Sequence, residues 1–161
     1  MRALYIGKFQ PFHKGHKKVV ELLRSFSNQI MIGIGSPQCE RYFSLEERVQ
    51  MVFKNTDISP FIAEDLQENH PMYSDWGQYI LNQTGSVNLI ATGNDYVRED
   101  FIAHDIPVLW LPRYFGISGT EIRDKIMNKD EGWKDFVHVV SVPIIESSLF
   151  YKRYWGKYGA L

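Results

Sequence analysis

The first two predicted elements of the chain are joined by Gly7-Lys8-Phe9-Gln10-Pro11-Phe12-His13-Lys14-Gly15-His16. The short apolar run Ala3–Gly7 before this stretch predicts a buried strand, and an apolar stripe at helical spacing follows it. Gly7 allows a tight backbone turn after the strand, and Pro11 favours an extended approach to the helix. Strand, loop and helix in this order are the opening of an α/β fold.

The same alternation continues along the chain. Four more runs rich in β-branched residues, each too short for a typical helix, predict strands at Ile30–Gly35, Phe61–Ala63, Val87–Thr92 and Val108–Leu111. Two helical stripes comprise Val19, Val20, Leu22, Leu23 and Phe26, and then Leu45, Val49, Val52 and Phe53. Ser44 and Glu47 have the spacing of a reciprocal capping box. Three further helices are expected over Tyr73–Gln83, Tyr96–His104 and Thr120–Met127.

This alternation predicts a doubly wound parallel sheet with helices on both faces, since parallel neighbours need right-handed crossovers. The 161 residues, 44% of them hydrophobic, are enough for one domain spanning 1–161, and no repeat or linker indicates a second. In such sheets ligands bind beyond the carboxyl ends of the strands. The segments after each strand are therefore the expected functional sites.

Composition restricts the function classes. The single cysteine, Cys39, cannot form an internal disulfide, and the first residues lack a signal peptide's apolar stretch, so we expect a cytoplasmic protein. No apolar run approaches the roughly 18 residues that span a bilayer. A net charge of −1 argues against broad attraction to nucleic acid or to anionic lipid. Any phosphate site must be local.

His13 and His16 are candidate phosphate ligands, because three-residue spacing places them on one face of the first helical turn. Backbone N–H groups at a helix start already favour anions, and two imidazoles add hydrogen-bond donors. The alternatives are a solvated histidine pair or a metal site, but no third or fourth metal ligand has convincing spacing, so no metal-ligating residue is assigned. Neither a Walker-type loop nor a Gly-x-Gly-x-x-Gly fingerprint is present.

A second stretch, Gly116-Ile117-Ser118-Gly119-Thr120-Glu121-Ile122-Arg123, follows the fifth predicted strand. Ser118 is a natural N-cap, and Gly119 leaves the backbone open to a ligand. Thr120 and Arg123 are three residues apart and share a side of the helix. A hydroxyl, free amides and a guanidinium would then converge on one anion, although an ordinary capped helix with an exposed arginine is the alternative.

Together the two stretches resemble the nucleotidyltransferase superfamily, which pairs a His-x-Gly-His loop with a late Ser-x-Thr-x-x-Arg-type motif. Similarity to the archaeal-type nicotinamide-nucleotide adenylyltransferases spans residues 1 to about 140. It extends through Ile6–His13, Gly33–Gln38, Glu46–Arg48, Asp65-Leu66, Trp76, Thr92–Asn94 and Trp133. The resemblance implies a Rossmann-like nucleotidyltransferase fold and transfer of AMP from ATP, with Mg²⁺, to nicotinamide mononucleotide (NMN) or nicotinic acid mononucleotide.

The resemblance also implies roles for individual residues. The catalytic cations and donors would be His13, His16, Lys8 and Arg123. The remaining ATP contacts would come from Gly7, Phe9, Ser118, Gly119, Thr120, Gly93 and Asn94. The acceptor would be bound by Trp76, Asp65, Gly35, Ser36, Gln38 and Arg48. Because a mononucleotide phosphate is already an anion at neutral pH, its attack would need positioning and charge stabilisation rather than a general base.

Several features leave alternatives open. Lys8 stands where the family usually has Arg, the route from Gln38 to Arg48 is shorter, and that from Asp65 to Trp76 is longer, all of which bear on the acceptor. Trp76 would alternatively be a core residue and Arg48 a solvated helix charge. Other acceptors of the superfamily are flavin mononucleotide, phosphopantetheine and, with CTP, glycerol 3-phosphate. A nucleotide-sensing module without turnover is the alternative from another class.

The segment 150–161 interleaves aromatic and basic side chains. Such a tail can stack on single-stranded nucleic acid, but more often it packs on its own domain or on a neighbouring subunit. We therefore expect no nucleic-acid partner, and we expect a homo-oligomer, as the relatives commonly are.

Overall fold

Strand β1 (Arg2–Gly7) is the central strand of a five-stranded parallel sheet in the computed structural model, which describes residues 1–113 and 116–156. The strand order is β3-β2-β1-β4-β5. The other strands are β2 (Gln29–Gly35), β3 (Phe61–Ala63), β4 (Leu89–Thr92) and β5 (Val108–Trp110). All five predicted strands are confirmed, and the reversal of strand order falls between β1 and β4.

Helices follow the strands in the predicted alternation. They are α1 (Lys14–Arg24), α2 (Leu45–Thr56), α3 (Trp76–Thr84), α4 (Asp95–Ile102) and α5 (Gly119–Met127). Two 3₁₀ turns, η2 (Glu131–Phe136) and η3 (Val139–Ser141), precede α6 (Val142–Ser147) and α7 (Leu149–Trp155). The capping box of Ser44 and Glu47 is present, and Asp75, Asn94 and Ser118 cap α3, α4 and α5 with their side chains.

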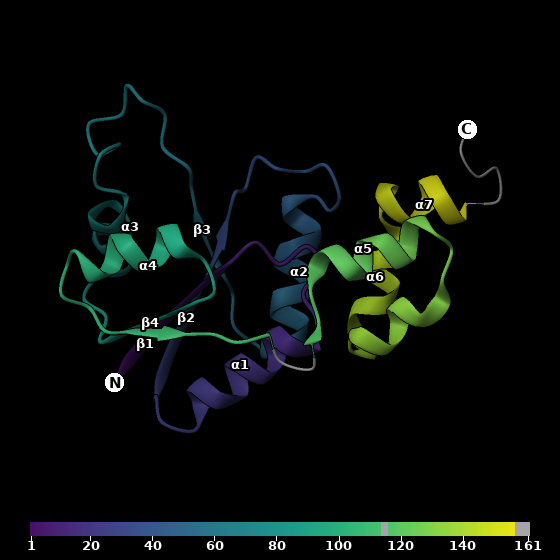
Figure 1. The fold of residues 1–161 in the computed structure, drawn as a ribbon, viewed down its shortest axis with the longest axis horizontal. Helices are drawn as coiled ribbons and strands as arrows, with labels where there is room; N and C mark the ends of the chain where they lie inside the picture. Colours follow the sequence, from purple (N-terminus) through teal and green to yellow (C-terminus); the bar gives the residue numbers. More distant parts are fainter. Residues whose placement is uncertain (114–115, 157–161) are drawn as a thin grey trace. The chain divides into compact units, whose positions relative to one another are not determined.

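The chain folds into two compact units, and the first contains the sheet. Unit 1 comprises Met1–Lys8, Val20–Pro37 and Pro60–Pro112. Helices α3 and α4 cover one face, where Leu4, Ile6, Ala63, Ile80, Val87, Ile90 and Phe101 form a buried apolar cluster. Figure 1 shows α1 on the other side of the sheet, with Val20 and Leu23 buried. The doubly wound α/β class is therefore confirmed.

Unit 2 brings together three separate stretches of the chain, Phe9–Val19, Gln38–Ser59 and Arg113–Leu161. Its core is helical: α2 packs on η3 and α6, while α5 packs on η2 and α7. The aromatic tail belongs to this core, because Phe150 is buried and the Trp155 indole N–H donates to the Ile126 carbonyl at 2.7 Å. The expectation that the tail packs on its own domain is thus confirmed for 150–156, while 157–161 lie outside the described residues.

Two predicted apolar stripes are partly wrong. Phe26 lies beyond the end of α1 and is exposed, and Phe53 of α2 is also exposed. Helix α2 instead buries Met51 and Val52 together with Arg48 and Asn55. Asn55 can lie inside because its amide donates to the Met51 carbonyl (2.7 Å) and to the Ser141 hydroxyl (2.8 Å). Polar side chains thus occupy part of the buried face of α2, and the Asn55 amide donors are hydrogen-bonded there.

Candidate functional site

The two histidines of the loop form a stacked pair at the start of α1. The ring centroids of His13 and His16 are 3.6 Å apart, with 18° between the planes. The His13 N–H donates to Nδ1 of His16 at 3.1 Å, and the Gly15 N–H donates to Nδ1 of His13 at 3.1 Å. Because each Nδ1 accepts a backbone hydrogen bond, each neutral ring carries its proton on Nε2. The pair is built to present two Nε2–H donors.

Both imidazoles are held neutral by their surroundings. Burial lowers the pKa of His13 from 6.5 to about 4. Burial, and then the charge that His13 would carry, hold the pKa of His16 well below its ordinary value. A bound polyanion would oppose both shifts, because a nearby negative charge favours the protonated imidazole.

This burial makes the stability of the fold depend on pH. Between pH 4 and 6.5 the unfolded chain binds a proton at His13 that the folded chain does not, so stability is lost as the pH falls through this window. From His13 alone we expect the free energy of unfolding to be about 2 kcal/mol lower at pH 5 than at pH 7.5. Urea unfolding at the two pH values measures the difference.

The matched variant is His13→Asn, whose side-chain oxygen can replace Nδ1 as the acceptor while removing the titrating ring. It should reduce the pH dependence, whereas His70→Asn, at a half-buried histidine of unit 1, should retain that of the wild type. An unchanged slope in His13→Asn would contradict the assignment.

Arg123 of α5 reaches the same loop within unit 2. Its Nη1 donates to the Gln10 carbonyl at 2.7 Å, and its Nη2 lies 3.1 Å from the Thr120 hydroxyl. Gly119 is required beside them, because a Cβ there would lie 2.9 Å from both the Gln10 carbonyl oxygen and Arg123 Nη1. Ser118 caps the helix by accepting from the Glu121 N–H at 3.2 Å. The two motifs predicted from sequence thus meet through the Gln10 backbone.

Phe9 completes this cluster from the other side of the histidines. The ring is buried, and its centroid lies 4.9 Å from that of His16 in an edge-on contact. We call Phe9, His13, His16, Ser118, Gly119, Thr120 and Arg123 the loop cluster. Its chemistry suits an anion with several oxygens, because it combines neutral imidazole donors, a guanidinium and the amide groups at a helix N-terminus.

Most of the other predicted residues lie in unit 1, at the carboxyl edge of the sheet. Parallel strands end at one edge, so the residues following β1 to β4 share it: Gly7 and Lys8, Gly35 and Ser36, Asp65, and Gly93 and Asn94. Gly35 is close to the end of β1, since a Cβ there would lie 3.9 Å from the Gly7 carbonyl oxygen. Asn94 is committed to its helix, accepting from Tyr96 and Val97 N–H groups.

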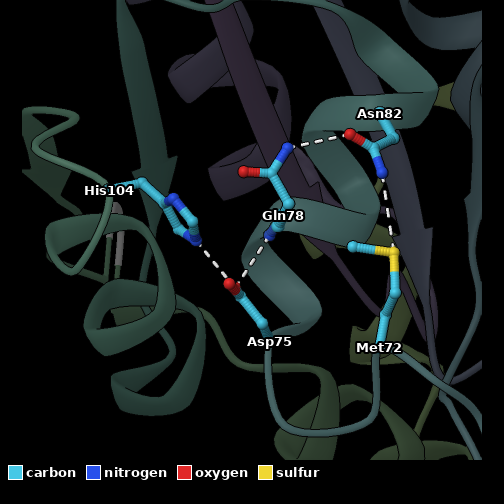
Figure 2. A network of polar contacts seen from close by, with 5 residues as sticks. All are labelled: Met72, Asp75, Gln78, Asn82 and His104. Carbon is cyan, nitrogen blue, oxygen red and sulfur yellow. Dashed lines mark hydrogen bonds and ion pairs between the residues drawn. The ribbon is translucent and has the colours of Figure 1, made fainter.

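Trp76 begins α3, and its position is fixed from several sides. It packs half-buried against the unit 1 cluster, and its indole N–H donates to the Glu64 carbonyl at 2.8 Å. Asp75, which caps the helix, also lies 2.7 Å from His104 Nε2, and the hydrogen bond with His104 is the main cause that lowers the pKa of Asp75. Figure 2 shows this network continuing from Gln78 through Asn82 to Met72. Because Trp76 packs half-buried against the unit 1 cluster, the alternative that it is a core residue is partly confirmed.

Arg48 and Gln38 lie in unit 2. The alternative that Arg48 is a solvated helix charge is wrong, because its side chain is fully buried. Burial lowers the Arg48 pKa, and the negative charges of Cys39 and Glu40 oppose that shift. Gln38 is exposed. Sequence reasoning did not identify Tyr42, whose ring lies 4.3 Å from the Arg123 guanidinium carbon, and no local pattern predicts that contact.

In the described ranges 1–113 and 116–156, no group of three or more His, Cys, Asp or Glu side chains is arranged to hold a metal ion. Over the same ranges, none of the helices is both long and apolar enough to cross a bilayer.

Comparison with known proteins identifies relatives over most of the chain. Residues 4–125 match the model of the cytidylyltransferase-like family. Nicotinamide-nucleotide adenylyltransferase from Methanocorpusculum labreanum is 35% identical, over 88% of this chain and 89% of that protein. The enzyme of the same description from Methanolobus tindarius is 32% identical, over 90% and 87%.

A solved structure supports the fold. The bifunctional NMN adenylyltransferase/ADP ribose pyrophosphatase of Francisella tularensis, solved with AMP and a manganese ion, superposes with a TM-score of 0.64 and 21% identity. The match covers 94% of this chain and half of the bifunctional protein.

Proposed function

The chain belongs to the cytidylyltransferase-like family, and from its similarity to the archaeal nicotinamide-nucleotide adenylyltransferases we propose that it transfers AMP from ATP to NMN, forming NAD and pyrophosphate. The observation that carries the proposal is the loop cluster, in which the loop that carries the stacked His13 and His16 also supplies the Gln10 carbonyl that accepts from Arg123. The cluster combines donors suited to phosphate oxygens with the family's two motifs. Tyr114 and Phe115, which directly precede the second motif, lie outside the described residues.

In the proposed reaction, a phosphate oxygen of NMN attacks the α-phosphorus of ATP, and the bond from that phosphorus to the bridging oxygen breaks as pyrophosphate leaves. The attacking oxygen is already an anion, so no proton has to be removed. His13, His16, Lys8 and Arg123 would stabilise the charge that develops on the phosphate oxygens. The remaining loop-cluster residues, with Gly7, Gly93 and Asn94, would hold ATP.

The acceptor would bind at the carboxyl edge of the sheet. Trp76 is proposed to stack on the pyridine ring, and its fixed indole would meet the ligand with little loss of conformational freedom. From the resemblance to the adenylyltransferases, each of Asp65, Gly35, Ser36, Gln38 and Arg48 is also proposed to contact the acceptor. Nicotinic acid mononucleotide differs only in a carboxylate and is proposed as a second substrate.

Mg²⁺ is proposed to arrive with ATP, held by phosphate oxygens. Hard oxygen ligands and retained water are typical of this ion, and with nucleotides the phosphates commonly supply most of its coordination. That fits the donor set of the loop cluster, which consists of N–H groups and hydroxyls rather than carboxylates.

We further propose that residues 1–161 act as one nucleotidyltransferase domain in the cytoplasm, assembled as a homo-oligomer. Val139 and Leu149 of unit 2, each more than 80% exposed, are apolar side chains that such a subunit contact would bury.

The test is pyrophosphate release from MgATP in parallel reactions with NMN, nicotinic acid mononucleotide, flavin mononucleotide and phosphopantetheine, and from CTP with glycerol 3-phosphate. We expect release with the pyridine mononucleotides only. Release with another acceptor would overturn the proposed acceptor site and keep the reaction class. Folded protein that binds ATP without releasing pyrophosphate from any mixture would instead be a nucleotide sensor.

A further inference from the structure

The Tyr42 ring lies beside the guanidinium of Arg123, a member of the loop cluster. The Cζ atom of Arg123 is 4.3 Å from the centroid of the Tyr42 ring, within the range of a cation–π contact. Arg41, which is exposed, lies farther from the same centroid at 5.3 Å. Tyr42 precedes α2 and Arg123 is in α5, so the contact joins separate segments of unit 2.

The guanidinium has more N–H donors than its hydrogen bonds within the protein use. It carries five of them in a fixed planar fork, besides the charge that the face of an aromatic ring attracts. In the described part of the chain, Gln10 and Thr120 engage two of the five donors of Arg123. Three contacts of different kinds thus fix a long side chain that would otherwise sample many rotamers.

Tyr42 is itself held by an aromatic column from the end of the chain. Its ring centroid lies 5.3 Å from that of Phe150 in α7, at 78° between planes. Phe150 is buried and makes similar edge-on contacts with Phe43 (5.5 Å) and Tyr154 (5.6 Å). The platform beneath Arg123 is therefore part of the core of unit 2.

We propose that Tyr42 is a positioning residue for adenylyl transfer, which holds the Arg123 guanidinium in the orientation that meets the triphosphate. The proposal rests on the proposed function for its kinetic consequence, but the stacking can be measured without turnover. The ligand concerned is the nucleoside triphosphate, and Tyr42 influences its binding only through Arg123.

The kinetic test compares Tyr42→Leu, which keeps apolar bulk on Phe150 but removes the π face, with Tyr42→Phe, which keeps the ring. We expect Tyr42→Leu to raise KM for ATP about tenfold, the size of a partly desolvated cation–π contact, and to leave KM for NMN within twofold. Tyr42→Phe should restore most of the loss. If Tyr42→Leu instead lowers kcat and leaves both KM values unchanged, the variant has only lost folded protein. That result would overturn the proposal.

A double-mutant cycle tests whether the effect passes through Arg123. In an Arg123→Gln background, Tyr42→Leu should change kcat/KM for ATP by less than twofold, because the cation it positions is gone. Losses that multiply would overturn the proposal.

The stacking is read directly from the NMR signal of the Arg123 Nε–H group, assigned by its absence in Arg123→Gln. Ring-current shielding should be present in the wild type and in Tyr42→Phe and lost in Tyr42→Leu; an identical shift in all three would overturn the contact. If the wild type shows this shift but releases no pyrophosphate, the proposed function is refuted and the contact between Tyr42 and Arg123 stands. If the wild type turns over normally and Tyr42→Leu has the same kinetic constants, the positioning role is refuted and the proposed function stands.

Discussion

Replacing His16 with alanine should lower kcat for pyrophosphate release by about 10²–10³ while the chain stays folded, the cost of removing one donor to developing negative charge. His16 Nδ1 accepts the His13 N–H, so the ring's remaining nitrogen, Nε2, carries the proton offered to the phosphate. Steady-state kinetics with saturating NMN, together with circular dichroism, measure both parts of the expectation.

His16→Asn separates the two uses of the ring. Its side-chain oxygen can accept the His13 N–H as Nδ1 does, but it has no group at the place of Nε2. We expect it to fold like the wild type and to be nearly as slow as His16→Ala. Near wild-type turnover in either variant would refute the catalytic role of His16.

Arg123→Ala should be the other large loss, again about 10²–10³ in kcat/KM for ATP, because it removes a fixed guanidinium that contacts the loop. Arg123→Lys should recover only part of the lost kcat/KM. The ammonium group keeps the charge, but it lacks the planar fork of donors and does not extend to the Gln10 carbonyl as the guanidinium does. The initial rates at varied ATP decide between these outcomes.

Lys125 offers a matched control on the same helix, because its ammonium pairs with Asp130 at 3.1 Å instead of reaching the loop. Lys125→Ala should leave kcat/KM within twofold. Equal losses in Lys125→Ala and Arg123→Ala would indicate that general surface charge, and not the placement of Arg123, attracts ATP.

The strands could be predicted because each short β-branched run is bounded by Gly or Pro, and the helix starts because Ser44 and Ser118 are capping residues. The buried face of α2 could not be predicted, since nothing local shows that Asn55 will find Ser141, 86 residues later in the chain. Apolar periodicity assigns such polar residues to the surface. It therefore placed Phe53 inside, where the structure has it exposed.

The candidate site was likewise predicted only in part. Spacing within a motif predicted that His13 and His16 share a face, and that Thr120 and Arg123 do. The Gln10 carbonyl and the Tyr42 ring were not predicted, because each meets Arg123 across a gap of more than 80 residues that only tertiary packing closes. Trp76 packs partly on the core and donates to the Glu64 carbonyl just after β3, while its stacking on the acceptor stays a prediction.

The aromatic column of Tyr42, Phe150 and Tyr154 has a consequence for when activity can arise during synthesis. Translation makes the histidine loop first and α7 after every other helix of unit 2. A nascent chain that has already extruded both motifs still lacks the support beneath Tyr42, so Arg123 does not yet have its full set of contacts. Newly made protein should therefore gain its full affinity for ATP only after the ribosome has released the last helix.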